Sequence, residues 1–243
     1  MMCVRMNGGR VSESAALIAA GVVLACAGTA SADPVFFGPT PYLSSADSPF
    51  GAVSFATFHL ENFEDGLFNT PGATASAGWS VSSPGPLIDS VDGDDGAIDG
   101  SGNGGRSFYS GGQNTVLTIT FDAGVLGGLP THVGIVWTDV GATFGALPEG
   151  FGNVIFQAFG PGNVALGSIG PVVMGDGAVT GGTAEDRFFG VSNAAGISSI
   201  VVTMPQSGDW EVDHLQYGIA VPGPGALGVV GFLGVVAGLR RRR

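Results

Sequence analysis

Residues 115–121 read TVLTITF and carry the clearest structural pattern of the chain. Leu117, Ile119 and Phe121 recur at every second position, and threonines stand between them. This period of two is typical of a β-strand with one buried face. A Gly-rich segment at 122–130 follows and predicts a turn.

The same kind of pattern recurs along the chain in both directions from this strand. Apolar, β-branched and aromatic side chains gather in short runs that Gly- and Pro-rich loops separate, and a helical period of 3.6 is missing. We predict further strands within 50–63, 132–137, 154–159, 161–169, 183–191, 197–204 and 209–218. Such a series predicts an all-β fold, here a single antiparallel β-sandwich over 50–220 that follows an extended leader at 33–49.

The N-terminus has the features of a secretory signal peptide over residues 1–32. Arg5 and Arg10 precede an apolar run at 15–27, and Ala30 and Ala32 flank a serine as a small-x-small cleavage site. We predict that signal peptidase cuts after Ala32. A second interpretation treats VLAC at 23–26 as a lipobox, in which Cys26 would carry a lipid.

The C-terminus reads VPGPGALGVVGFLGVVAGLRRRR over residues 221–243. The prolines predict a hinge, formed by Val221, Pro222, Gly223 and Pro224. Residues 225–239 lack charged side chains and would form a helix roughly 22 Å long. We predict that these residues form a transmembrane helix. The body of the protein would lie outside the cytoplasm, and the positive charges that follow the helix would lie on the cytoplasmic side, namely those of Arg240, Arg241, Arg242 and Arg243.

This order of Pro motif, apolar helix and terminal arginines resembles the PEP-CTERM tails of bacterial envelope proteins. The usual Val-Pro-Glu-Pro has Gly223 in place of Glu in this chain. The resemblance implies a sorting signal that an exosortase-type enzyme reads and cleaves, and hence a final place at the cell surface or in the extracellular matrix. The body, with segments such as NFEDG, GIVWTD and WEVDHLQYG, also resembles the jelly-roll-like domains that precede such tails.

The charge of the predicted mature body excludes some partners. Its two arginines, Arg106 and Arg187, stand against 19 acids, so residues 33–220 carry 2 − 19 = −17 formal charges. Nucleic acid and anionic lipid are poor partners for such a surface, whereas divalent cations are good ones. Both cysteines, Cys3 and Cys26, lie in the signal peptide, so the mature body has no thiol chemistry.

An acidic loop, DSVDGDDGAIDGSGNGG at 89–105, is a candidate calcium site. Calcium takes six to eight oxygen ligands, and glycine lets a loop fold tightly around it. The candidate ligands are Asp92, Asp94, Asp95 and Asp99. A solvated acidic loop without a metal is the alternative, because the spacing does not match an EF-hand.

Asp213 in the last strand is a second candidate ligand. Strict alternation would place it on one face with Leu215 and Tyr217, where a carboxylate needs Arg187 or a cation as its partner. In jelly-roll carbohydrate-binding modules, to which the body is similar, a structural calcium joins an acid of the first strand to an Asp of the last. That resemblance implies Glu61 or Glu64 opposite Asp213. A solvent-exposed Asp213 is the alternative.

The sequence predicts no catalytic residues. HExxH and GxSxG motifs are absent, and His214 and Asp213, as neighbours in a strand, should point to opposite faces. We therefore expect a non-enzymatic structural or interaction protein of the envelope. The alternative is a carbohydrate-binding module for exopolysaccharide, which exposed aromatic side chains would favour. We expect its candidates to be buried, namely Trp79, Trp137 and Trp210.

Overall fold

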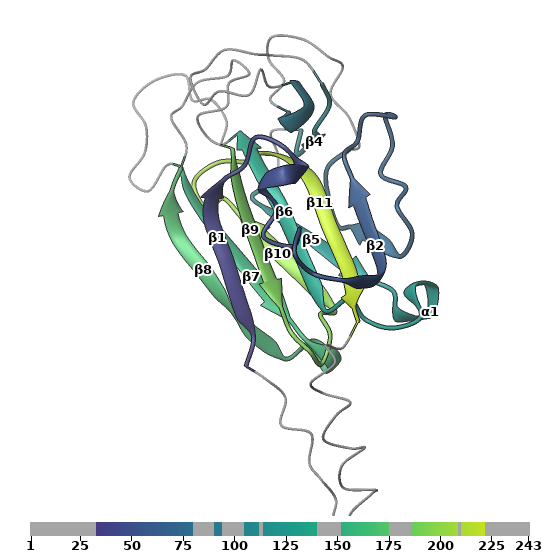
Figure 1. The fold of residues 1–243 in the computed structure, drawn as a ribbon. Helices are drawn as coiled ribbons and strands as arrows, with labels where there is room; N and C mark the ends of the chain where they lie inside the picture. Colours follow the sequence, from purple (N-terminus) through teal and green to yellow (C-terminus); the bar gives the residue numbers. More distant parts are fainter. Residues whose placement is uncertain are drawn as a thin grey trace, which may run out of the picture. The chain divides into compact units, whose positions relative to one another are not determined.

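A computed structural model describes residues 33–79, 90–93, 105–111, 114–139, 152–174, 186–208 and 210–221 (Figure 1). The predicted signal peptide, residues 222–243 of the predicted tail and the candidate ligands Asp94, Asp95 and Asp99 lie outside these ranges. Within them, no helix is long and apolar enough to cross a membrane. The predicted transmembrane helix at 225–239 belongs to the part that is not described.

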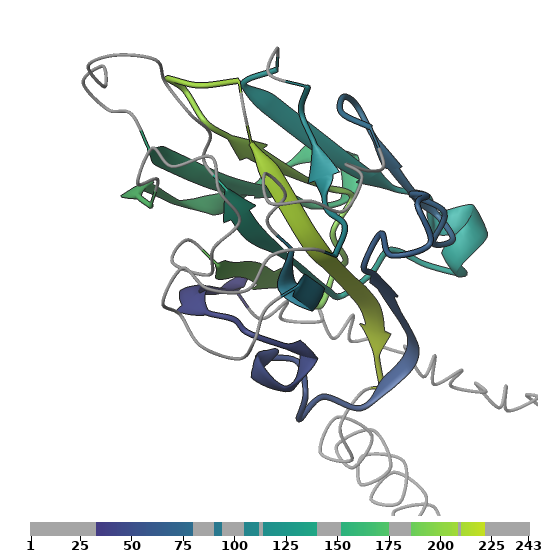
Figure 2. The same ribbon diagram turned by 90° about the horizontal axis from the view of Figure 1, so that it is seen from above.

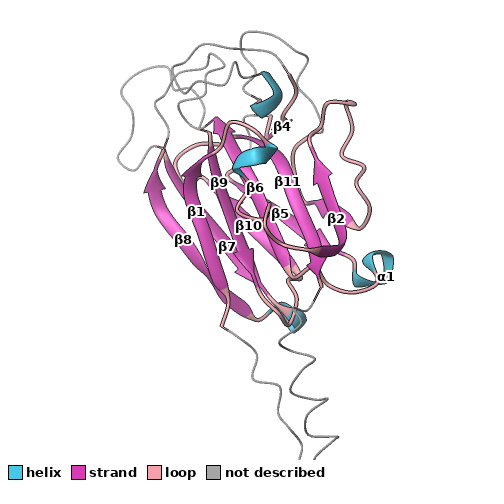
Figure 3. Ribbon diagram, in the orientation of Figure 1, coloured by secondary structure: helices cyan, strands magenta, loops and turns pink. Residues whose placement is uncertain are grey.

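Two antiparallel sheets pack face to face (Figures 1 and 3). Sheet A has the order β1 (Val35–Pro41), β9 (Arg187–Ser192), β6 (His132–Asp139), β11 (Glu211–Ala220) and β2 (Phe55–Glu61), and β4 (Phe108–Tyr109) also pairs with β11. Sheet B has the order β3 (Ala73–Ala75), β5 (Val116–Phe121), β10 (Ser199–Thr203), β7 (Asn153–Phe159) and β8 (Ala165–Val173). The prediction of an all-β antiparallel sandwich is confirmed.

The strand pairs are nested, as in a jelly roll. Strand β2 pairs with β11, β5 with β10, β6 with β9 and β7 with β8. The chain therefore resembles one long hairpin, with its tip at β7 and β8, that is rolled so that its pairs alternate between the two sheets. This topology places β11, the last strand, between β6 and β2 in sheet A.

The main core lies between the sheets and uses the side chains that alternation predicted. Leu117, Ile119 and Phe121 of β5 are buried there, as are Ile200 and Val202 of β10. Trp137 and Trp210 are fully buried, as expected. The expectation for Trp79 is wrong, because that side chain is 58% exposed.

Three strands and the short helices were not predicted. Strand β1 falls within the segment 33–49 that we expected to be an extended leader, and β3 and β4 are only three and two residues long. Helix α1 (Ala123–Leu126) lies in the predicted turn after β5, where Asp122 Oδ1 accepts from Gly124 N and Gly127 ends the helix at φ 76°. The remaining helical turns are η1 (Ser45–Asp47), η2 (Val91–Gly93) and η3 (Pro161–Asn163).

A second, smaller core covers the outer face of sheet A. Tyr42 and Phe50, from the segment between β1 and β2, pack there on Phe188 of β9 and Val136 of β6. Figure 2 shows this N-terminal segment beside sheet A. Strand β11 is consequently buried on both faces from Glu211 to Gly218, which explains why its sequence does not alternate.

Candidate functional site

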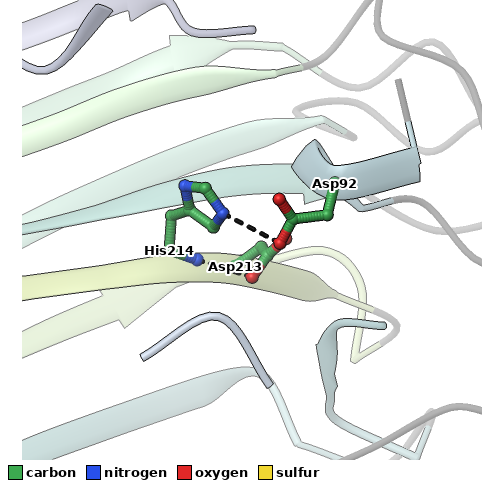
Figure 4. Close-up of side chains that lie close together, drawn as sticks. All are labelled: Asp92, Asp213 and His214. Carbon is green, nitrogen blue, oxygen red and sulfur yellow. Dashed lines mark hydrogen bonds and ion pairs between the residues drawn. The ribbon is translucent and has the colours of Figure 1, made fainter. Parts of the chain in front are cut away.

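Asp92, Asp213 and His214 come together at the outer face of sheet A (Figure 4). Asp92 lies in η2, whereas Asp213 and His214 are neighbours in β11. One ligand atom from each side chain lies within 4.8 Å of the others. His214 Nε2 is 3.1 Å from Asp92 Oδ2, the one ion pair found among the described side chains.

A β-bulge in β11 makes this arrangement possible. Asp213 lies opposite Val136 and Gln216 lies opposite Gly134, so β11 has one residue more than β6 over this interval. His214 takes up the extra residue with a positive φ of 42°.

The bulge overturns two predictions from strict alternation. Asp213 does not share a face with Leu215 and Tyr217, because it lies opposite Val136 of the outer core, whereas Leu215 and Tyr217 face the main core. The side chains of Asp213 and His214 also do not diverge, since both lie against Asp92. One signal was present in the sequence. Apolar residues occur at 210, 212, 215 and 217, and the step of three in this series is typical of a bulge.

A directed chain of hydrogen bonds leads to His214 from the segment that covers sheet A. Phe50 N donates to Ser48 Oγ (3.2 Å), and Ser48 Oγ donates to Gln216 Oε1 (2.6 Å). Gln216 Nε2 then donates to Tyr42 Oη (2.7 Å), which lies 3.1 Å from His214 Nδ1. Burial raises the pKa of Tyr42, so this hydroxyl keeps its proton.

The direction of this chain fixes the tautomer of His214. Because Tyr42 Oη already accepts from Gln216, its own proton is directed to Nδ1. In the neutral ring the remaining proton is then on Nε2 and is donated to Asp92 Oδ2. Asn62 Nδ2 donates to the same Asp92 oxygen at 3.1 Å.

Asp213 is a fully buried carboxylate that is surrounded by donors. Its Oδ1 accepts from His214 N (2.6 Å), and its Oδ2 accepts from Val91 N (3.0 Å) and Ser90 Oγ (3.1 Å). Burial raises the pKa of Asp213 to about 7, although these hydrogen bonds and a charge on His214 act in the opposite direction. The carboxylate therefore joins segment 90–93 to the last strand.

The other two members of the cluster shift each other's titration. The hydrogen bond from His214 lowers the pKa of Asp92, against the effect of burial. Burial lowers the pKa of His214, but the hydrogen bond to Asp92 and the charges of Asp213 and Asp92 outweigh it, so that the pKa is raised. The cluster therefore favours an ionised Asp92 beside a protonatable imidazole.

The other predicted acids have different partners. Glu61 Oε1 accepts from Phe63 N (3.1 Å), and Oε2 accepts from Asn69 N (2.8 Å) and Thr70 N (2.9 Å), so this carboxylate holds the loop after β2 together. Glu64 accepts from Arg106 N. Arg187 does not reach Asp213 but donates from Nη1 to the carbonyl of Asp186 (2.7 Å).

The described part of the cluster fits calcium poorly. It offers oxygens from two carboxylates and one imidazole nitrogen, whereas calcium takes six to eight oxygens. A metal at His214 Nε2 would also move the ring proton to Nδ1. Tyr42 Oη would then face two donors, and its own proton would need a new acceptor. A complete calcium shell would need further oxygen ligands, such as main-chain carbonyls, other carboxylates or water.

Comparison of this chain with protein-family models, with curated proteins and with solved structures finds no match.

Proposed function

We propose that this chain is an exported protein of the cell envelope or extracellular matrix, and that its β-sandwich is a structural and interaction domain without catalytic activity. The observation that carries the non-catalytic part is the use of the buried polar groups. In the hydrogen-bond chain from Ser48 to Asp92, the donors and acceptors bind one another and so join the segment between β1 and β2 to β11. An active site would instead direct such groups at a substrate.

The other two imidazoles support the same proposal, because both pack against aromatic rings. His59 lies 5.1 Å from the ring of Tyr217. His132 is surrounded by Phe50 at 5.2 Å and Phe55 at 5.4 Å, and burial lowers its pKa. Contacts of this kind suit a side chain that serves in packing.

Export and sorting rest on the two chain ends. We propose that signal peptidase releases the body after Ala32 and that an exosortase-type enzyme reads residues 221–243. Expression of the full-length chain in a bacterium with an exosortase, followed by cell fractionation and mass spectrometry, tests this. We expect an N-terminus at Asp33 and loss of the tail. A chain that stays in the cytoplasm with residues 1–32 attached would overturn the proposal.

A divalent cation is proposed at the acidic loop 89–105, with Asp92 as the ligand shared with the cluster. Asp92 suits this role because its side chain is 38% exposed, so that a cation can reach it from solvent. The other ligands would be Asp94, Asp95 and Asp99. Glu61 and Asp213 are not proposed as ligands, because the hydrogen bonds described above already use their oxygens.

Thermal melting of the full-length chain in calcium and in chelator tests the cation. A cation that binds only the folded state stabilises it by ~2.7 kcal/mol at 100 times its dissociation constant. We expect a rise of several degrees in calcium that Asp94→Ala abolishes and that the exposed control Asp33→Ala leaves unchanged. Equal melting points in calcium and chelator would show that the loop is solvated surface.

A further inference from the structure

We infer that an open groove beside Trp79 is a binding site for a neutral polysaccharide. The groove has a volume of about 520 Å³, and the residues that line it include Leu67, Asn69, Thr74, Trp79 and Phe108. This volume is within the range of about 300–1,000 Å³ that is usual for ligand pockets. The inference rests on the proposed function only in that export would bring the domain to polysaccharide outside the cell.

Trp79 is exposed and yet held in place. The main-chain N–H of Trp79 donates to Tyr109 O (3.0 Å), and its main-chain carbonyl accepts from Tyr109 N (3.2 Å). This β-bridge to β4 fixes the main chain of Trp79. A Cβ added to Gly111 would lie 2.5 Å from the Trp79 ring, which shows that the glycine main chain supports the indole closely. A rigid aromatic surface loses little entropy when a ligand binds to it.

A second part of the groove lining, Leu67 and Asn69, is also held in place by hydrogen bonds. Leu67 and Asn69 belong to the loop after β2, whose main chain donates to the Glu61 carboxylate. Asp65 accepts from Leu67 N (2.8 Å) and from Asn69 Nδ2 (2.7 Å). Glu61 and Asp65 thus fix the conformation of this loop. They are positioning residues, so that Leu67 and Asn69, like Trp79, are held in place before any ligand arrives.

Strand β3 supplies main-chain groups along the groove. It is an edge strand that, within the described ranges, pairs only with β5. Asp122 N donates to Gly72 O, and Ser76 N donates to Thr118 O. In an antiparallel pair this means that the main-chain N–H and C=O groups of residues 72, 74 and 76 point towards β5. The N–H and C=O groups of Ala73 and Ala75 therefore point away from β5, where hydroxyl groups of a ligand can reach them.

These features fit a sugar better than other ligands. A pyranose has an apolar C–H face for the electron-rich face of an indole and a rim of hydroxyl groups for main-chain donors and acceptors. None of the residues that line the groove is charged, and the predicted body is strongly acidic, which disfavours a polyanion. An extended peptide is less suitable, because β3 is three residues long and too short for strand addition.

Affinity electrophoresis of the full-length chain tests the inference, with a non-glycosidic detergent to keep the chain in solution. The gels contain hydroxyethylcellulose, dextran or yeast mannan, and an alginate gel is the anionic comparison. We expect retardation in at least one neutral gel. Trp79→Ala should weaken it by about tenfold or more, because the indole face is lost. Trp79→Phe should retain part of it.

A second readout follows from the burial of the other two tryptophans. Trp137 and Trp210 are 0% exposed, so acrylamide should quench mainly Trp79, and the retarding polysaccharide should protect it. Val164→Ala is the matched control, since Val164 is 63% exposed and lies elsewhere. It should be retarded like the wild type.

Three results would overturn the inference. They are no retardation of the wild type in any neutral gel, equal retardation of a folded Trp79→Ala chain, and stronger retardation in alginate than in the neutral gels. Each is separate from the export assay, because a correctly processed chain that fails in the gels contradicts this site alone. Likewise, a chain that binds polysaccharide without being exported contradicts only the proposed location.

Discussion

Asp213 is the residue on which the polar cluster depends. Its carboxylate is fully buried, and it accepts from two main-chain N–H groups and from the hydroxyl of Ser90. A carboxylate in this position is costly in its charged form, and this cost is the reason for its raised pKa. Its titration should therefore be visible in the stability of the whole domain.

We predict that stability falls as the pH rises towards 8. The pKa of Asp213 is about 7 in the folded state, whereas the ordinary pKa of an aspartate, which applies to the unfolded chain, is 3.8. Between these values the folded state holds a proton that the unfolded state has lost, so its stabilising contribution is lost as the pH rises through 7. The raised pKa of His214 acts with the same sign. Urea unfolding at pH 5, 6, 7 and 8 measures the slope, which is at most about 1.4 kcal/mol per pH unit for one proton.

Asp213→Asn should remove most of this slope, because the amide does not titrate. It should also lower the stability at pH 5, because the amide NH₂, unlike the hydroxyl of the protonated carboxyl, cannot accept from the donors that surround Asp213. The control is Asp33→Asn, an exposed carboxylate before β1. A slope that persists in Asp213→Asn would contradict the assignment of the titration to Asp213.

At the scale of the element, β6 and β9 each have a glycine where the ring of Phe188 packs on them. Gly134 and Gly190 lie opposite each other, and Phe188 lies over both. A Cβ on Gly134 would be 2.2 Å from Phe188 Cζ, and one on Gly190 would be 2.7 Å from Phe188 Cε1. The absence of side chains at these two positions lets the outer core of sheet A form.

We predict that Gly134→Ala destabilises the domain by about 1–3 kcal/mol, the usual cost of overpacking. Phe188→Leu makes room for the new methyl group, so the double variant should lose less than the sum of the two single losses. Chemical denaturation of the four proteins measures this coupling. Gly128→Ala is the control, because its Cβ would make an ordinary contact at 3.5 Å with Ile219. Additive losses would show that Phe188 does not restrict Gly134.

The elements also show where sequence patterns succeed and fail. Strands β5 and β10 were predicted with their buried faces, because each has one face in the main core and the other away from it. Strand β11 was predicted as a strand with the wrong faces, because both of its sides are covered and a bulge interrupts it. Strands β3 and β4 are too short to leave a periodic pattern at all.

At the scale of the whole molecule, the segment before β2 belongs to the fold. Strand β1 extends sheet A next to β9, and Tyr42 and Phe50 close the outer core. Tyr42 is stacked on Phe188 at 5.8 Å, and Phe50 meets the same ring edge-on at 5.4 Å. The same segment supplies Ser48 and Tyr42 to the hydrogen-bond chain that ends at Asp92.

We predict that deletion of residues 33–50 from the full-length chain abolishes cooperative unfolding. Each buried aromatic side chain contributes roughly 1.5–3 kcal/mol, and a domain is typically stable by about 5–15 kcal/mol. Near-UV circular dichroism during thermal melting provides the measurement. Val35→Ala, a change at a 52% exposed position in the same segment, should leave the melting point nearly unchanged. A deletion variant that melts cooperatively near the wild-type temperature would show that the cover is dispensable.

The sequence by itself determined the fold class and the main core. The alternation of apolar and polar residues along a half-buried strand is a local property, so it is visible in the sequence. It also determined which side chains are acidic, aromatic or imidazole. It did not determine which of them meet. Asp92 and Asp213 are 121 positions apart, and Tyr42 and Gln216 are 174 apart.

Only the tertiary structure decided those meetings. The nested pairing of strands places β11 in the middle of sheet A, the bulge turns Asp213 and His214 to one side, and the segment before β2 covers them. The exposure of Trp79 was decided in the same way, by its bridge to Tyr109 and by the support of Gly111. Long-range packing sets these positions, and a period of two along the chain carries no information about it.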